Sequence, residues 1–147
     1  MRAQCSTSTA PCAPRSAAEV ADGVAIRRAF EQYCEHLTAH DARAIAALYA
    51  PDASIEDPAG SVPIVGRHAI EAFYAGALSR VQPELVELTG PVRALANGTA
   101  GAATLASTST RDGRRMKLDI IDVMTFDADG LITSMHAYWG PENLTTL

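Results

Sequence analysis

The chain has 147 residues, of which 48% are hydrophobic and 20% charged, and its formal net charge is -5 at pH 7. This length and apolar content fit one globular domain with its own core. The acidic balance and the scattered lysines and arginines argue against a nucleic-acid partner. No apolar run reaches the roughly 18 to 20 residues that cross a bilayer, so we expect no membrane association and a cytoplasmic location.

The first residues differ in composition from the rest of the chain. Residues 1–22 are rich in Ser, Thr, Ala and Pro and show no apolar period. This composition is typical of a disordered tail, with a targeting peptide as the alternative. We therefore expect a disordered N-terminal tail over 1–22 and a single domain over 23–147. The odd number of cysteines argues against a disulfide framework, and Cys34 is interpreted as a packing thiol.

Apolar residues at helical spacing predict three helices in the first half of the domain. The first begins near Val24. The second is capped by Asp41 and ends before Pro51, and the third covers 67–78. The residues expected to face inward are Ile26, Phe30, Tyr33 and Leu37 in the first helix, Ile45, Leu48 and Tyr49 in the second, and Ile70, Phe73, Tyr74 and Leu78 in the third.

A short strand is predicted over 52–57, between the second and third helices. Its alternation places Ala53, Ile55 and Asp57 on one face. Pro58 cannot donate a hydrogen bond to a sheet, so the strand ends where Asp57 is presented, at the start of a loop.

The second half of the domain is predicted to be strands. We expect strands over 83–88, 92–97, 99–110, 115–126 and 131–139, separated by turn pairs such as Asn97-Gly98, Asp112-Gly113 and Asp129-Gly130. Helices followed by hairpin-linked strands indicate an α+β fold in which a curved sheet wraps the helices.

The strand over 115–126 carries an acid in an apolar stripe. Alternation puts Asp122 on one face with Met116, Leu118, Ile120, Met124 and Phe126, unless a one-residue bulge exchanges the faces. A buried carboxyl group without a cationic partner is expected to be protonated. The alternative is a structural Asp satisfied by an arginine, a backbone amide or a turn.

No Lys or Arg shares the apolar faces near Asp57 or Asp122, whereas three inward tyrosines come from the helical region. Tyrosine hydroxyls suit a neutral acid, although each tyrosine alone is most often a core aromatic residue. Trp139, the only tryptophan, falls on a strand face with Leu131, Met135 and Ala137 and suits the core or a pocket wall.

Other chemistries have weaker support. His36 and His40 are four residues apart on a helix, but no further ligand follows at metal-site spacing, so we interpret them as surface residues. Phosphate-binding, nucleophile-elbow and CxxC motifs are absent from the sequence. We therefore expect no metal and no cofactor.

The segment YCEHLTAHDARAIAALYAPDASIEDPAGSVPIVGRHAIEAFYAG resembles the N-terminal half of the Δ5-3-ketosteroid isomerases. The resemblance continues through ELTGPVRALAN and IIDVMTFDADGLITSMHAYWGPEN, and so covers nearly everything after the tail. These enzymes belong to the NTF2-like, or SnoaL-like, superfamily. The resemblance implies a cystatin/NTF2-like cone in which a curved mixed β-sheet and three N-terminal helices enclose an apolar pocket.

The resemblance also implies a steroid delta-isomerase with a small apolar ketone, a steroid, as substrate. Asp57 would move a proton from C4 to C6, while Tyr33 and Asp122 would donate to the C3 oxygen. Ketosteroid isomerase is the known case of a carboxylic acid held neutral by an apolar site so that it can donate. The residues implied to support the site are Tyr49 and Tyr74 as a tyrosine network, and Trp139, Met135 and Phe73 around the pocket.

Family members are usually homodimers that work without a cofactor, and the same is implied here. Two alternatives stay open: a related cyclase, dehydratase or isomerase acting on another ketone or polyketide, and a non-catalytic binder of apolar ligands. The strand LASTSTRDGRR is more polar than the family pattern, and the chain between Tyr74 and Asp122 is longer. Both departures bear on the choice of substrate.

Overall fold

The computed structural model describes residues 17–147, and most of the predicted tail lies outside this range. The division of the chain into a tail and a single domain stays a prediction, but helix α1 covers Ala17–Thr38 and therefore begins before residue 22. The reason is local: Ala17, Ala18, Glu19 and Ala21 are strong helix formers, although they add no apolar period.

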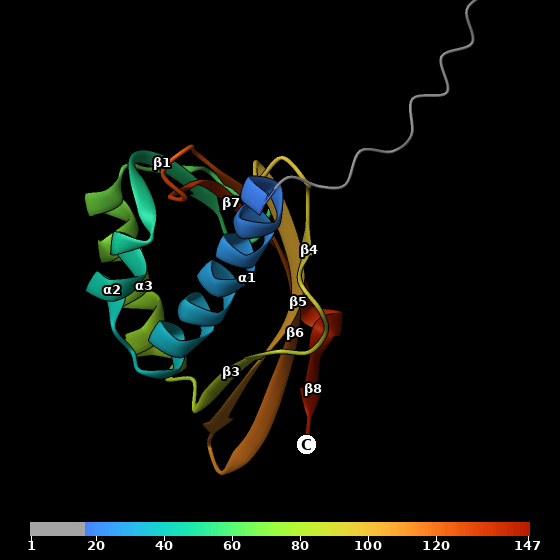
Figure 1. Cartoon of the computed structure of the whole chain (residues 1–147). Helices are drawn as coiled ribbons and strands as arrows, with labels where there is room; N and C mark the ends of the chain where they lie inside the picture. The colour runs from blue at the N-terminus through green and yellow to red at the C-terminus, as the bar shows by residue number, and fades with distance from the viewer. Residues whose placement is uncertain (1–16) are drawn as a thin grey trace, which may run out of the picture.

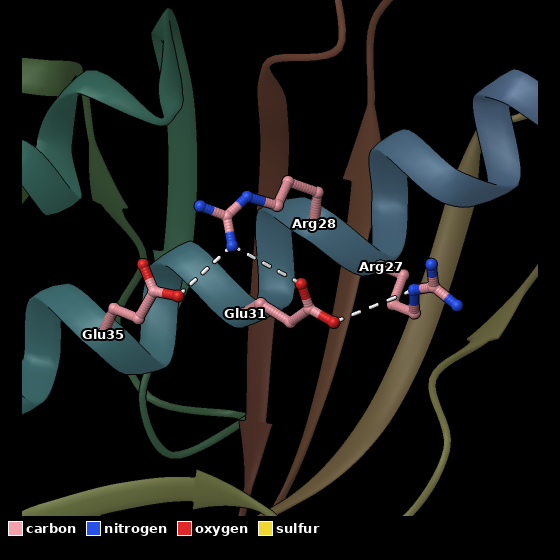
Figure 2. Close-up of polar contacts among 4 residues, drawn as sticks. All are labelled: Arg27, Arg28, Glu31 and Glu35. Carbon is pink, nitrogen blue, oxygen red and sulfur yellow. Dashed lines mark hydrogen bonds and ion pairs between the residues drawn. The ribbon is translucent and has the colours of Figure 1, made fainter.

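Helix α1 has one charged face and one apolar face, which fixes the direction of Tyr33. Arg28 pairs with Glu31 at 3.5 Å and with Glu35 at 3.2 Å, and Arg27 pairs with Glu31 at 3.8 Å (Figure 2). These exposed pairs add little stability, but they mark the solvated face. The opposite face carries the predicted inward stripe, in which Ile26, Phe30 and Tyr33 are buried.

Glycine allows α1 to approach the sheet closely. A Cβ atom at Gly101 would lie 2.7 Å from Cγ2 of Ile26, closer than side chains tolerate. Gly101 lies on strand β5, which covers Ala100–Arg111, so its lack of a side chain lets α1 approach that strand closely.

The second helix is shorter than predicted. Helix α2 covers Ala42–Ala47, and its predicted cap is confirmed because the Asp41 carboxylate accepts from the Ala44 amide at 2.9 Å. Tyr49 does not lie on this helix: strand β1 covers Tyr49–Glu56 and begins before Pro51. Pro51 is tolerated because the pairing of β1 shifts register between Tyr49 and Ser54, where no regular ladder bond is required.

Strand β2 covers Ile64–Val65 and leads into helix α3, which covers Arg67–Val81 and buries Ile70, Tyr74 and Leu78. Six further strands and one 3-10 turn follow. They are β3 Leu85–Leu88, β4 Arg93–Ala94, β5 Ala100–Arg111, β6 Arg114–Phe126, β7 Ile132–Tyr138, η1 Pro141–Asn143 and β8 Leu144–Thr146.

In the described part of the chain the strands form one mixed sheet in the order β2-β1-β7-β6-β5-β3, with β4 on β5 and β8 on β6. The β1–β7 pairing is parallel and the others are antiparallel. The sheet curves around α1, with α2 and α3 on the far side of that helix (Figure 1). The predicted α+β fold with a curved mixed sheet is confirmed.

Within the described residues, no helix is long and apolar enough to cross a membrane. The cytoplasmic location stays a prediction.

Candidate active site

Two carboxyl groups face one cavity from opposite sides of a single small residue. Strand register pairs Asp122 on β6 with Ala137 on β7. On the other side of β7, β1 pairs Glu56 with His136, so the next residue, Asp57, comes beside Ala137. The Ala59 amide donates to the Ala137 carbonyl at 2.7 Å and closes this arrangement. Two strand spacings separate the acids, about 10 Å between Cα atoms.

Asp122 lies in an apolar setting. It is 3% exposed, and its other neighbour across the sheet is Ala103, which is also buried. Among the described residues, its Oδ1 atom has no hydrogen-bond partner. Burial, and secondarily the negative charge of Asp57, raises the pKa of Asp122 to about 8. The group is therefore neutral at pH 7 and carries a proton that it can donate into the cavity.

Asp57 occupies a more open position where β1 ends. Its Oδ1 atom accepts a hydrogen bond from the indole Nε1 of Trp139 at 2.6 Å. Burial raises the pKa of Asp57, whereas the indole donor lowers it by stabilising the ionised form. The two acids thus differ in their surroundings: one has a donor at the cavity mouth, and the other has apolar neighbours.

Three tyrosine hydroxyls form a chain behind the cavity. The Tyr33 hydroxyl shares a hydrogen bond with the Tyr74 hydroxyl at 3.0 Å, and the Tyr74 hydroxyl shares a second with that of Tyr49 at 2.9 Å. Burial is the main cause that raises the pKa of each hydroxyl well above its ordinary value. All three are therefore protonated at neutral pH, and Tyr33 brings this chain to the cavity wall.

The cavity has a volume of about 130 Å³ and a mainly apolar wall. Of the predicted site residues, Tyr33, Asp57, Asp122, Tyr74 and Phe73 line it. Tyr49 lies one hydrogen bond behind, and Trp139 lies at the mouth, 37% exposed. Met135 is not part of the wall. It is fully buried in the core, where it pairs across the sheet with Met124, which is also fully buried.

Several site contacts were not predicted. The bond between Trp139 and Asp57 joins residues 82 positions apart, and no local pattern reveals it. Ala137 was predicted to share a face with Trp139, but its place between the two acids depends on the parallel pairing of β1 and β7. Arg67 donates to the Tyr49 carbonyl at 2.9 Å and fixes the start of β1. The sequence therefore predicts the tyrosine and acid positions and the place of Phe73 in the wall, but not the contacts across the sheet that join them.

The remaining candidate groups have structural explanations. Cys34 is buried, and burial raises the pKa of its thiol to about 12, so the predicted packing role fits. The Nε2 atom of His40 forms a hydrogen bond with the Pro83 carbonyl at 2.6 Å. No cluster of three or more metal-binding side chains occurs among residues 17–147.

Chemically, the cavity combines a base and an acid. Asp57 can accept a proton once ionised, while the neutral Asp122 and the Tyr33 hydroxyl can donate to an oxygen atom. Preorganised donors in a dry site stabilise an oxygen atom that gains negative charge. The arrangement is thus suited to acid-base chemistry on an apolar molecule that carries an oxygen function.

This fold and site belong to a defined class. The model of the SnoaL-like domain matches residues 30–135. The chain belongs to the SnoaL-like family. It is 45% identical over 121 residues to the steroid Delta-isomerase of Nocardioides simplex, a match that covers 81% of this chain and 93% of that protein.

Two further relatives carry another activity in their names. Epoxide hydrolase LasB of Streptomyces lasalocidi is 32% identical over 113 residues, which cover 74% of this chain and 39% of that protein. A solved structure of the epoxide hydrolase/cyclase-like enzyme SalBIII, described by its role in pyran ring formation in polyether salinomycin, superimposes with a TM-score of 0.73 at 26% identity. This match covers 83% of this chain and 95% of that one.

Proposed function

We propose that the protein is a steroid delta-isomerase that converts a 3-oxo-Δ5-steroid to its conjugated Δ4 isomer. The observation that carries the proposal is the placement of Asp57 and the neutral Asp122 on opposite sides of Ala137 in one apolar cavity. The 45% identity to a steroid Delta-isomerase over most of both chains supports the same activity.

The proposed reaction is a transfer of one proton within the substrate. The Asp57 carboxylate takes a proton from C4, and the electrons of that C–H bond move toward the C3 oxygen to form a dienolate. Asp122 and Tyr33 donate hydrogen bonds to this oxygen as it gains charge. Asp57 then returns the proton to C6, so the C5=C6 bond becomes C4=C5. No atom is gained or lost, and no cofactor is required.

The test is direct because the product is a conjugated enone with a strong ultraviolet absorbance. Purified protein should convert a 3-oxo-Δ5-steroid, and Asp57→Asn should not. Asp52→Asn is the matched control, because Asp52 lies on the same strand but is exposed. An inactive wild-type protein on several Δ5 ketones would overturn the substrate assignment.

A second candidate function rests on the two epoxide-related relatives. The reaction would be the opening of an epoxide ring. Neutral Asp122 would protonate the epoxide oxygen while Asp57 accepts the proton of the attacking water or hydroxyl. One C–O bond breaks as another forms, and exchange with water resets both acids. Turnover of epoxides without turnover of Δ5 ketones would favour this candidate.

We further propose that the protein acts as a homodimer that packs through the outer face of the sheet. Ile121 is 46% exposed and pairs with Tyr138, which is 53% exposed, so two large apolar side chains lie together on that face. Light scattering should give twice the chain mass of 15.5 kDa. Ile121→Arg should give the single-chain mass, and a single-chain mass for the wild type would contradict the proposal.

A further inference from the structure

The inner face of the β5–β6 hairpin extends the cavity past the catalytic end. A second hollow of about 660 Å³ shares Val81, Ser107 and Leu118 with the cavity, so the two adjoin along these residues. Figure 1 shows the end of this hairpin reaching beyond the helices. We call this second hollow the distal groove. Its sheet wall consists of Ser107, Ser109, Arg111, Arg114, Met116 and Leu118.

The two strands give the distal groove two chemically different edges. Register pairs Ser107 with Leu118, Ser109 with Met116 and Arg111 with Arg114. One edge is therefore apolar along β6, the other carries hydroxyls along β5, and the groove ends at two guanidinium groups. Such a wall suits an alkyl chain that ends in an oxygen-rich anion.

The charge at the hairpin end of the distal groove also favours an anion. The charged groups that line the distal groove are Arg111, Arg114 and Asp112, which leaves a net charge of +1. Arg111 is held across the groove, because its Nη2 atom donates to the Arg80 carbonyl of α3 at 3.5 Å. Asp112 is confined to the hairpin turn with a φ of 51°.

The distance along β6 from Asp122 to Arg114 indicates the size of the ligand. Eight residues along β6 separate Asp122 from Arg114, about 27 Å at about 3.4 Å per residue. With C–C bonds of about 1.5 Å, four fused rings span less than half of this length. A ligand that reaches from Asp122 toward the arginines therefore needs a side chain at the far end of the ring system.

We propose that the distal groove binds the carboxylate end of a 3-oxosteroid that retains an acidic alkyl side chain at C17. The proposal rests on the proposed function, because it assumes that the ketone lies at Asp122. The proposal names the substrate class: the site binds 3-oxosteroids with a carboxylate on the C17 side chain in preference to neutral steroids of the same length.

Binding is tested without turnover by using two Δ4-3-oxosteroids, one with a five-carbon carboxylic acid at C17 and the other its methyl ester. Trp139 is the only tryptophan and lines the distal groove, so its fluorescence reports occupancy. The wild type should bind the acid about ten-fold more tightly than the ester, as expected for charge-assisted bonds in a partly exposed site. This preference should weaken as salt increases.

The arginine double variant R111Q/R114Q should bind acid and ester equally and leave ester binding unchanged. R111K/R114K should recover part of the preference, because the charge returns. The control is Arg115→Gln beside the single variant Arg114→Gln: each removes one positive charge from β6, but Arg115 lies on the opposite face of the strand and pairs with Thr110.

Equal binding of acid and ester by the wild type would overturn the inference. So would a loss of the acid preference in Arg115→Gln as large as that in Arg114→Gln, because the preference would then come from the overall positive charge of the hairpin and not from the distal groove. Failure of the proposed function is a separate outcome. Arginine-dependent binding without isomerisation of any Δ5 ketone would refute the isomerase, whereas isomerisation of short neutral steroids with no acid preference would refute only the distal groove.

Discussion

The two ends of the cavity contain the same side chain in opposite conditions. At the end of β1, Asp57 is half-buried and accepts from Trp139. On β6, Asp122 is buried between two alanines, and Oδ1 has no partner among the described residues. One carboxyl group therefore has a donor that stabilises its ionised form, while the other has none and holds its proton at neutral pH. The division of labour follows from the surroundings, not from the residue type.

The sharpest way to break this comparison is to remove the base. Asp57→Asn should lower kcat for isomerisation by about 10²- to 10⁴-fold or more, because the amide cannot take the proton. Binding of a phenol that mimics the dienolate should persist, since its donors Tyr33 and Asp122 remain. A rate within ten-fold of the wild type would contradict the role of Asp57.

Replacing the acid at the other end separates donation from charge. Asp122→Ala should reduce kcat by about 10²- to 10³-fold, the usual cost of losing one donor to a developing oxyanion. Asp122→Asn keeps a donor and should lose clearly less. Asp119→Asn on the exposed face of the same strand is the control. Equal losses for Ala and Asn would argue against donation.

The pH dependence of the rate should have one limb for each acid. In the proposed reaction Asp57 is ionised and Asp122 is protonated, so the rate should fall at low pH and again above about pH 8, where Asp122 loses its proton. The alkaline limb should vanish in Asp122→Asn, because an amide does not titrate. A limb near pH 8 that survives in this variant would assign it to another group.

Stability should depend on pH through the same group. The pKa of Asp122 is about 8 in the folded state, and about 3.9 is usual in an unfolded chain. The folded state thus retains a proton that the unfolded chain releases. This stabilising contribution is complete below the unfolded value and is lost as pH rises toward 8. Between about pH 5 and 7.5, urea unfolding should show a slope up to about 1.4 kcal/mol per pH unit steeper for the wild type than for Asp122→Asn.

The smallest effect is expected at the cavity mouth. Trp139→Phe removes the donor that lowers the pKa of Asp57, so the acid limb of the rate should move to higher pH. The rate at neutral pH should fall only a few-fold, since one exposed hydrogen bond is worth about 1 kcal/mol. A shift of the limb in the opposite direction would show that the indole does not stabilise the ionised Asp57.

The sequence predicts this site where local periodicity is unbroken. Asp122 follows an uninterrupted alternation on β6, and Tyr33 and Tyr74 follow helical stripes, so each faces inward as expected. Tyr49 was placed on the wrong element, because its spacing from Ile45 continues a helical period across the start of β1. Contacts across the sheet cannot be seen in this way. The bond from Trp139 to Asp57 depends on β1 and β7 pairing in parallel, which no local signal encodes.

The chain of tyrosine hydroxyls has a consequence for proton order. Three hydroxyls connected by two hydrogen bonds can be oriented in either direction, and the oxygen positions alone do not choose between them. A ligand oxygen that accepts from Tyr33 fixes the order, because Tyr74 must then donate to Tyr33 and Tyr49 to Tyr74. Binding one oxygen atom would therefore align three O–H dipoles toward it, a cooperative polarisation that reaches Tyr49 at the start of β1.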